Sequence, residues 1–325
     1  MSDGVRLVMG KIALAQPIVT ARGTWSERRG VRIELSDGDL VGHGEATPLP
    51  GYSPDDVDAC ARALSEIGPL VDVRSIRIAS RFDGALALLP CARFALETAL
   101  VDLEAQRRGT SVAAVLAGGR PLESVPLSGL VDLAAPDLEA RARALVARGI
   151  GTVKVKVGAA PRDVELTRLG ALRRTLGDGV SLRLDANGAF DLAGAVLLLR
   201  DLAAFAPELV EEPTSGEALA ALGAAPCPWG ADESLQNAHV AELLLASPCA
   251  AFVIKPQLHG LPAARALAVR AQEAGKGVIV THLFDGPVAM AAARELALSL
   301  PMAPWACGLD AHPGMGLFSF SREPR

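Results

Sequence analysis

The sequence predicts an α/β fold in which a closed barrel of alternating strands and helices follows a smaller α+β domain. Two observations carry this prediction. From residue 125 to residue 310, short apolar and β-branched runs recur roughly every 20 to 30 residues, with a helical segment between each pair. Before residue 125 the runs are longer and partly alternate between apolar and polar residues, which is typical of antiparallel strands. The chain has 325 residues, enough for one barrel and an attached domain.

Residues 1–95 are predicted to form the α+β domain, which would cap the barrel. Residues 5–46 have the pattern of antiparallel strands, and the residues SDGD at 36–39 are a hairpin turn signal. The segment TARGTWSERRG at 20–30 is polar and rich in arginine. It is either a solvated hairpin loop or a mobile lid that brings cations toward an anionic ligand. Helices are expected at 55–66 and 91–108.

Residues 96–310 are predicted to form the barrel, a modified TIM-type (β/α)7β arrangement in which every strand except the last is followed by a helix. The strands are expected at 125–131, 151–158, 180–188, 209–213, 228–234, 251–256, 277–284 and 304–310. The helices between them are expected at 136–148, 161–176, 191–204, 215–223, 238–247, 261–275 and 287–300. Residues 311–325 are too few for another unit, and we expect them to pack on the capping domain.

Composition and charge argue against several classes of protein. Hydrophobic residues make up 50% of the chain and charged residues 21%, which is typical of a globular protein. The net charge of −5, without a Lys/Arg cluster, gives no basic surface for nucleic acid. The longest apolar stretches, such as 241–254, are too short to span a membrane. Five scattered cysteines and a first segment without a secretory pattern favour a reduced, cytoplasmic location.

Three carboxylates stand at the ends of three successive predicted strands. They are Asp185 in LRLDANG, Glu211 in VEEP and Asp232 in ADES. The carboxyl ends of neighbouring parallel strands lie about 4.8 Å apart at one rim of a barrel, so these side chains can reach one cation. Taken singly, each residue is also typical of a turn, a helix entry or a cap. Their recurrence at consecutive strand ends favours a site for Mg²⁺ or Mn²⁺.

Lysines flank the carboxylates along the chain. Lys154 and Lys156 are separated by one valine, so both point to the same side of a strand. An edge strand with a solvated lysine face would have the same pattern, but a closed barrel has no edge. Lys255, on the strand after the one that carries Asp232, would approach the same space from the opposite side. A lysine of lowered pKa beside a divalent cation is suited to removing a proton next to a carboxylate.

These motifs, in this order, resemble the muconate-lactonizing branch of the enolase superfamily. The motifs are KVK at 154–156, LRLDANG, VEEP, ADES and VIKP at 253–256. Within that branch, GHGEATPLPGYS at 42–53 and CGLD at 307–310 are most similar to the o-succinylbenzoate synthase family. The resemblance covers nearly the whole chain and implies a metal-dependent enzyme that acts on a small-molecule carboxylate. It leaves the oligomeric state open.

The resemblance also implies roles for single residues. Lys156 matches the base, Lys154 its electrostatic partner, and Lys255 the lysine that stabilises the enediolate from the opposite face. The Mg²⁺ ligands would be Asp185, Glu211 and Asp232. The implied reaction is the syn elimination of water from 2-succinyl-6-hydroxy-2,4-cyclohexadiene-1-carboxylate, a step in menaquinone biosynthesis.

Substrate contacts are expected from residues that stand near these motifs. Asn187 and Arg183 lie beside Asp185, and Thr281 and Gly308 are expected to line a succinyl pocket. Gly51 in the PLPGYS segment is a further candidate. His282 has no role in this scheme, and a barrel histidine is more typical of a hydrogen-bonded core or rim residue. The other histidines have no metal-ligand spacing.

Other functions remain open at this point. An N-acylamino acid racemase or a dipeptide epimerase of the same superfamily would keep all six lysine and carboxylate residues. Dipeptide epimerases typically carry an Asp-x-Asp near the eighth strand, where this chain has Asp310-Ala-His312, and this difference weighs against them. A metal-free barrel aldolase that forms a Schiff base on Lys255 or Lys156 belongs to another class. A non-catalytic scaffold is the remaining alternative.

Overall fold

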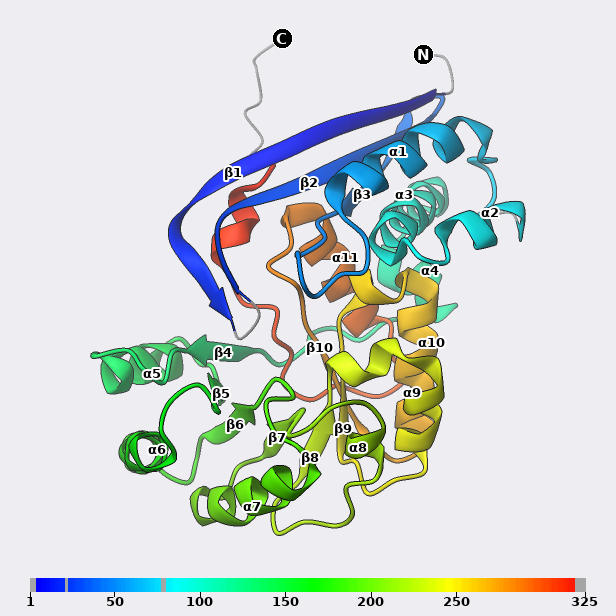
Figure 1. The fold of residues 1–325 in the computed structure, drawn as a ribbon. Coiled ribbons are helices and arrows are strands. Elements are labelled where there is room, and N and C mark those ends of the chain that lie inside the picture. Colours follow the sequence, from blue (N-terminus) through cyan, green and yellow to red (C-terminus); the bar gives the residue numbers. More distant parts are fainter. Residues whose placement is uncertain (1–3, 21–22, 77–79, 319–325) are drawn as a thin grey trace.

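An antiparallel sheet with helices lies over one end of a parallel sheet surrounded by its own helices (Figure 1). The computed structural model describes residues 4–20, 23–76 and 80–318. This arrangement confirms the predicted fold class, a (β/α)7β barrel preceded by an α+β cap. Among the described residues, no helix is both long enough and apolar enough to cross a membrane.

The cap is built on a three-stranded antiparallel sheet with the order β1-β2-β3. The strands are β1 (Gly4–Thr20), β2 (Gly23–Asp37) and β3 (Leu40–Ala46). The turn between β2 and β3 is the predicted one. The predicted loop at 20–30 is wrong for residues 23–30, which continue β2 in register with β1, whereas residues 21–22 lie outside the described residues. Residues 23–30 form a strand and not a loop because they pair with β1. Lys11 of β1 also forms an ion pair with Glu27 of β2.

Five helical segments follow the sheet. They are α1 (Val57–Ile67), η1 (Gly68–Leu70), α2 (Ser80–Leu86), α3 (Pro90–Arg108) and α4 (Val112–Ala117). The sequence pattern predicts α1 and α3 but not α2 and α4. Each of these two helices is about two turns or less, which is too short for an apolar period to stand out.

Helix α3 joins the two parts of the molecule. Most of its buried residues between Cys91 and Leu103 pack into the core of the cap. Two of them, Phe94 and Val101, pack into the core of the barrel instead. The predicted boundary after residue 95 therefore falls inside one continuous helix. Close contact with β3 depends on two glycines, because a Cβ at Gly42 or Gly44 would lie 2.1 or 1.8 Å from a backbone oxygen of α3.

The barrel is a seven-stranded parallel sheet with the order β10-β9-β8-β7-β6-β5-β4. Its strands are β4 (Ser128–Val131), β5 (Thr152–Lys156), β6 (Ser181–Asp185), β7 (Leu209–Glu211), β8 (Trp229–Ala231), β9 (Ala251–Ile254) and β10 (Gly277–Val280). Its α-helices are α5 (Leu138–Ala147), α6 (Arg162–Leu176), α7 (Leu192–Leu202), α8 (Gly216–Ala220), α9 (Ala238–Leu245), α10 (Leu261–Glu273) and α11 (Pro287–Leu298). Short 3-10 turns occur at η2 (Ala203–Phe205), η3 (Glu233–Gln236), η4 (Pro256–Leu258) and η5 (Pro313–Gly316).

The eighth strand is the main departure from the predicted barrel. Residues 304–310 are all described, and they form no regular strand. Instead, two single bridges close the sheet, with Cys307 next to Leu127 and Gly308 next to Thr281. Residues 304–310 contain Pro304 and Gly308, and proline in particular weakens a strand because it lacks an N–H donor.

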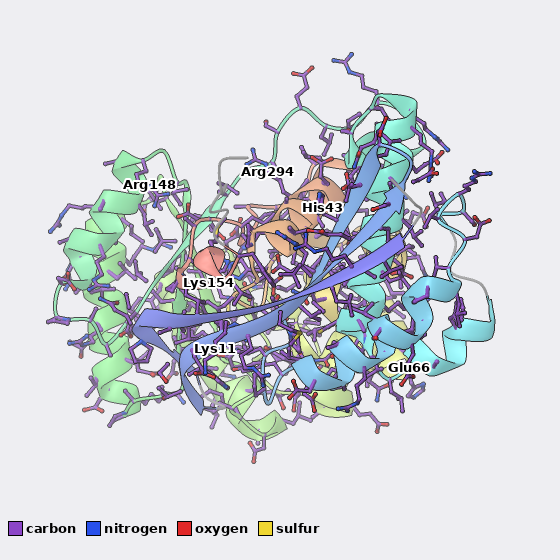
Figure 2. All side chains as sticks on the ribbon, turned by 90° about the horizontal axis from the view of Figure 1, so that it is seen from above. Lys11, His43, Glu66, Arg148, Lys154 and Arg294 are labelled. Carbon is purple, nitrogen blue, oxygen red and sulfur yellow. The ribbon has the colours of Figure 1, made fainter. Side chains whose placement is uncertain are left out.

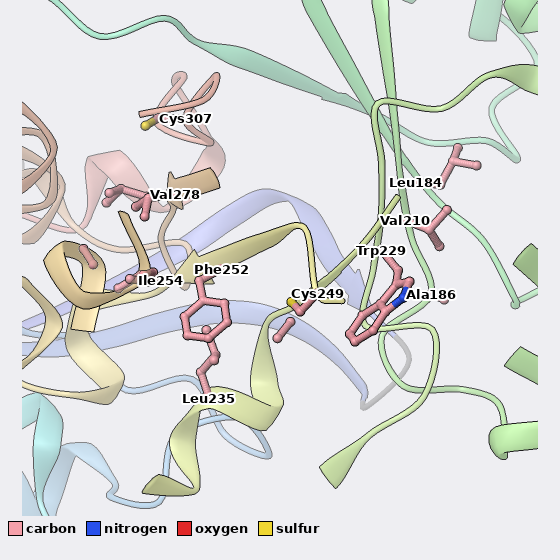
Figure 3. Packing of buried hydrophobic residues seen from close by; sticks show 14 of the residues in the cluster. Leu184, Ala186, Val210, Trp229, Leu235, Cys249, Phe252, Ile254, Val278 and Cys307 are labelled. Carbon is pink, nitrogen blue, oxygen red and sulfur yellow. The ribbon is translucent and has the colours of Figure 1, made fainter. Parts of the chain in front are cut away.

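Two apolar layers hold the barrel together. The larger layer lies between the strands and the helices, and Figure 3 shows part of it, with Val210 and Trp229 packed near Leu184. The smaller layer includes Leu209, Val253 and Ile279, residues on the opposite face of the strands, and fills the barrel interior. The interior is therefore a packed floor beneath the strand ends.

Arg28 of β2 ties the cap to the barrel. Its side chain is 2% exposed. The guanidinium donates hydrogen bonds to the carbonyl oxygens of Thr47 and Pro48 in the cap. It also donates to the carbonyls of Leu283 and Phe284, which follow β10 in the barrel. A buried guanidinium with four carbonyl acceptors keeps these two loops at a set distance.

The described part of the C-terminal segment contacts the cap sheet. A Cβ at Gly10 of β1 would meet the ring of Phe318, and a Cβ at Gly30 of β2 would meet Leu317. The Arg32 guanidinium lies 5.6 Å from the centre of the Phe318 ring. Leu317 and Phe318 thus lie against the cap sheet, and residues 319–325 lie outside the described residues.

The close approach of β3 to α3 makes Gly44 a test of this packing. Replacing Gly44 with Ala should lower the free energy of unfolding by about 1–3 kcal/mol, because the added methyl group meets the Ala95 carbonyl and the helix must shift. Thermal unfolding followed by circular dichroism measures this. Gly119→Ala is the matched control, since its added methyl group meets nothing within 4 Å. Equal melting temperatures for the two variants would contradict the packing described here.

Candidate active site

A cavity of about 250 Å³ lies at the carboxyl ends of the barrel strands, beneath the cap. The view from above in Figure 2 looks past the cap strands, with Lys154 toward the middle of the molecule and Arg148 on the outer helical side. The cavity is lined by Leu49 and Tyr52 of the cap and by residues from β4, β5, β6 and the segments after β8, β9 and β10. It also includes residues 308 and 310–313 of the segment that closes the barrel.

Strand register explains why the charged residues meet in this cavity. Alternate residues of a strand share a face, so residues 154 and 156, 183 and 185, and 209 and 211 all point into the barrel. Lys156 pairs with Asp185 across β5 and β6, and Asp185 pairs with Glu211 across β6 and β7. Asp232 follows β8 directly and completes the set. One step lower on this face lie Lys154 below Lys156, Arg183 below Asp185 and the apolar Leu209 below Glu211.

Asp185, Glu211 and Asp232 form a compact group of buried carboxylates. One oxygen atom from each residue lies within 4.8 Å of the others, and each residue is at most 4% exposed. Glu211 Oε1 is enclosed by protein and has no hydrogen-bond partner among the described residues. Three converging carboxylates with such an unpaired oxygen fit a hard divalent cation such as Mg²⁺, which prefers oxygen ligands.

Lys154 offsets part of the negative charge. Its Nζ lies 2.9 Å from Asp185 and 2.5 Å from Glu211. Burial alone would lower the pKa of Lys154, but the charges of Asp185 and Glu211 outweigh burial and raise it above its ordinary value. The residue is a permanent cation beside the carboxylates.

Lys156 has a different environment. Its Nζ donates a hydrogen bond to Asn187 Oδ1 at 2.7 Å and lies 3.9 Å from Asp185. Burial lowers the pKa of Lys156, and the charges of Lys154 and Lys255 add to this effect against the opposing charge of Asp185. Asn187 accepts this bond from a left-handed backbone conformation with φ of 46°. Lys156 is thus the lysine best able to become a neutral amine.

Lys255 lies at the opposite side of the cavity, where Glu233 is a partner that the sequence motifs did not single out. The Nζ of Lys255 lies 2.6 Å from Asp232 and 2.8 Å from Glu233. Burial acts to lower the pKa of Lys255, but these two carboxylates raise it well above its ordinary value. The only signal for Glu233 in the sequence is its position directly after a predicted ligand.

Glu212 holds the backbone of the loop that carries Asp232. Its carboxylate accepts hydrogen bonds from the backbone N–H of Asp232 and of Ser234, and from the Ser234 hydroxyl. Burial raises the pKa of Glu212 to about 7, and the charge of Glu233 adds to this effect. The residue has a φ of 43°, a conformation that costs free energy in a non-glycine residue. This backbone turn presents Glu211 to the cavity and Glu212 to the loop after β8.

The predicted substrate contacts divide into two groups. Asn187, Thr281 and Gly308 line the cavity, and the Thr281 hydroxyl donates a hydrogen bond to the Gly308 carbonyl. Arg183 does not line it, because its side chain is 1% exposed and bonds the Ala306 carbonyl and Glu208 below the carboxylates. Gly51 does not line it either. The cap loop reaches the cavity through Leu49 and Tyr52 instead.

Several cavity residues carry no motif and were not predicted. Ser128 and Leu130 come from β4, whose sequence lacks a charged tip. His312 was set aside because its spacing from other histidines fits no metal site, yet its ring stacks on His282 with centroids 4.0 Å apart. This contact joins two loops about 30 residues apart, and no local sequence pattern reports such a pairing.

Comparisons with known proteins agree with this geometry. Residues 3–117 match the family model "Mandelate racemase / muconate lactonizing enzyme, N-terminal domain", and residues 137–323 match the model "Enolase C-terminal domain-like". The two models meet in the region between α4 and α5.

Individual relatives include both epimerases and synthases. The L-Lys-D/L-Arg epimerase of Methylococcus capsulatus is 33% identical over 285 residues, which cover 83% of this chain and 79% of that protein. An o-succinylbenzoate synthase of Thermobifida fusca is 34% identical over 191 residues, covering 58% of this chain and 59% of that protein.

Among solved structures, a dipeptide epimerase from Methylococcus capsulatus, complexed with Mg and the dipeptide L-Arg-D-Lys, superposes with a TM-score of 0.85. It is 30% identical, and the match covers 95% of this chain and 91% of that one. The family models, the relatives and the buried carboxylates agree on one assignment. The chain belongs to the enolase superfamily, in its mandelate racemase and muconate lactonizing enzyme family.

Proposed function

We propose that this chain is a Mg²⁺-dependent racemase or epimerase that removes and returns the α-proton of an N-substituted α-amino acid. One observation carries the proposal. Lys156 and Lys255 reach the same cavity from β5 and from the end of β9, and three strands separate β5 from β9 in the barrel. An α-carbon between them has one amine on each face, which is what inversion of a stereocentre requires.

The lysines divide the proton transfer between them. Lys156 has the lowered pKa, and it takes the α-proton at Nζ from one face of the substrate. Lys255, which Asp232 and Glu233 hold as a cation, donates a proton from the other face. The two roles are exchanged for the other stereoisomer. Asn187 keeps the Lys156 amine directed into the cavity.

The carboxylates and Lys154 determine the distribution of charge in the site. Asp185, Glu211 and Asp232 hold the metal ion, and Lys154 stays charged beside two of them. When bound, Mg²⁺ supplies positive charge that makes the α-proton of a coordinated carboxylate more acidic. The packed apolar floor under the site excludes water from below, which strengthens these interactions.

Similarity favours epimerisation over elimination of water. The epimerase relative is 33% identical over 83% of this chain, whereas one synthase is 34% identical over 58% of it and another is 29% identical over 90%. A solved dipeptide epimerase also covers 95% of the chain. The sequence had favoured the synthase reaction, and Asp310-Ala-His312 had weighed against a dipeptide epimerase. Asp310 does line the cavity, but Arg148 already pairs with it at 2.6 Å.

A second candidate is the o-succinylbenzoate synthase reaction. Its support is the identity of 34% to the Thermobifida synthase, together with the contact of Thr281 and Gly308 at the cavity wall. The same lysines and carboxylates would serve, since both reactions begin with removal of an α-proton.

Replacing the lysines tests the proton transfers. In D₂O with Mg²⁺, Lys156→Ala and Lys255→Ala should each lower epimerisation of the substrate by on the order of 10²–10⁴-fold, because each removes one of the two acid–base groups. Proton NMR of the α-hydrogen measures exchange for N-acetyl-leucine and glycyl-leucine in both configurations. Lys11→Ala, an exposed lysine of the cap, is the matched control. Undiminished epimerisation in either active-site variant would remove that lysine from the mechanism.

Removing a ligand charge tests the metal site. Asp232→Asn should weaken Mg²⁺ binding by more than the roughly 10- to 100-fold that loss of an outer partner costs, since a ligand charge is lost. Isothermal titration with Mg²⁺ alone gives the affinity. Asp310→Asn is the control, because Asp310 lines the same cavity but lies outside the carboxylate group. If both variants bind Mg²⁺ as the wild type does, these carboxylates are not the site.

A direct comparison separates the two candidate reactions. We expect the kcat/KM for dehydration of 2-succinyl-6-hydroxy-2,4-cyclohexadiene-1-carboxylate to fall at least about tenfold below that for α-proton exchange on the best N-substituted amino acid. Formation of o-succinylbenzoate and the NMR exchange rate are measured on the same enzyme sample. A reversed order would establish the synthase as the main activity.

A further inference from the structure

Two histidines form an aromatic wall at the end of the cavity away from the metal ligands. His282 follows β10, and His312 lies in the segment that closes the barrel. Their rings stack with centroids 4.0 Å apart and planes inclined by 25°. Phe284 meets both rings edge-on, with centroids 5.6 and 5.8 Å away. None of these residues has a part in the proton transfers.

Backbone contacts determine where each imidazole carries its proton. The Phe284 N–H donates to His282 Nδ1 at 2.9 Å, and the Gly314 N–H donates to His312 Nδ1 at 3.1 Å. A neutral imidazole that accepts at Nδ1 must carry its hydrogen on Nε2. Both rings therefore present Nε2–H as a donor. Phe284 makes its bond from a φ of 55°, a strained conformation for an aromatic residue.

These donors lack acceptors. His312 Nε2 is enclosed and has no hydrogen-bond partner among the described residues. His282 Nε2 also has no acceptor in the part of the chain that the structure describes, and it is not among the enclosed atoms. It is thus open to the cavity that its ring lines. A donor without an acceptor beside an apolar surface is unfavourable, and a ligand oxygen would relieve this.

Several cationic side chains lie near the histidine pair. Burial lowers the pKa of His282 well below its ordinary value, and His312, Lys255, Lys154 and Arg28 add to this effect. Burial likewise lowers the pKa of His312 to about 4, and Arg28 adds to it. The charges that keep the imidazoles neutral also disfavour a cationic group of a ligand placed beside them.

The surroundings of the histidine pair are mainly apolar. Leu49, Tyr52 and Leu283 form a small cluster with Phe284 and Trp25, which covers this end of the cavity. The nearby carboxylate of Asp310 is paired with Arg148. An uncharged or acceptor-bearing group therefore matches this end of the cavity better than an ammonium group does.

We propose that His282 and His312 form a subsite for the acyl group of an N-acylated amino acid, with His282 Nε2–H donating to an acyl oxygen. His312 is a positioning residue that holds the His282 ring by stacking. This inference rests on the proposed function, since it places the α-carbon between the two lysines and the N-substituent toward the histidines. It predicts that the enzyme selects N-acyl amino acids over dipeptides with a free amino terminus.

N-acetyl-L-leucine and glycyl-L-leucine are suitable probes. They differ only in that the dipeptide carries an ammonium group on the acyl methyl carbon. Isothermal titration of the Mg²⁺-loaded enzyme should show that N-acetyl-L-leucine binds about tenfold more tightly, because the ammonium group of the dipeptide would lose its water next to an apolar wall and near the cations Lys255 and Arg28. N-succinyl-L-leucine, which adds an acceptor carboxylate, should bind at least as well as the acetyl compound.

Three variants separate the donor from the ring. His282→Phe keeps an aromatic ring but loses the donor to the acyl oxygen, so N-acetyl-L-leucine should bind about tenfold more weakly. His312→Phe keeps the stack and should retain most of the wild-type affinity for N-acetyl-L-leucine. His239→Phe, on an exposed helix outside this cavity, controls for the substitution itself. Circular dichroism verifies that all three variants are folded.

The outcomes distinguish the subsite from the proposed function. Tighter binding of glycyl-L-leucine, or an unchanged affinity of His282→Phe for N-acetyl-L-leucine, would overturn the subsite even if both probes are epimerised. The expected preference without any α-proton exchange would uphold the subsite and count against the epimerase activity. Binding is measured independently of turnover, so failure of one proposal does not conceal the other.

Discussion

The structure depends on holding three like charges together. Asp185, Glu211 and Asp232 approach within 4.8 Å in a buried site, where their mutual repulsion is far stronger than in water. Two lysines from different strands offset the charge, Lys154 beside the first two carboxylates and Lys255 beside the third. A closed parallel barrel is what makes this possible, because it brings strand ends from distant parts of the chain to one rim. The helices, the apolar floor and the cap all stabilise that rim.

The barrel and the metal ligands could be predicted because they follow short periods in the sequence. Each ligand ends an apolar run, and Lys154 and Lys156 have the spacing of one strand face. The residues that the sequence placed wrongly or did not single out also have physical explanations. Arg183 points to the same side of β6 as Asp185 but lies two residues nearer the start of the strand. There its guanidinium already donates hydrogen bonds to the Ala306 carbonyl and to Glu208. His312 reaches His282 only through the tertiary fold.

Substrate recognition is separated from the chemistry. The lysines and carboxylates come from β5 to β9, whereas the opposite wall comes from the cap loop, the turn after β10 and the closing segment. Arg28 keeps the cap loop and the turn after β10 together, which gives this wall a constant shape. Relatives with different activities share about a third of their residues with this chain, so overall identity leaves the substrate open.

The way the barrel closes has an evolutionary consequence. Residues 304–310 are held to the neighbouring strands by two single bridges and by backbone hydrogen bonds of Trp305, Cys307 and Gly308. Residues 311–313, which follow, line the cavity and belong to no strand. Replacements in a loop of this kind disturb little of the surrounding fold, while they change the wall of the cavity. New substrate preferences can therefore arise here while the lysines and carboxylates stay unchanged.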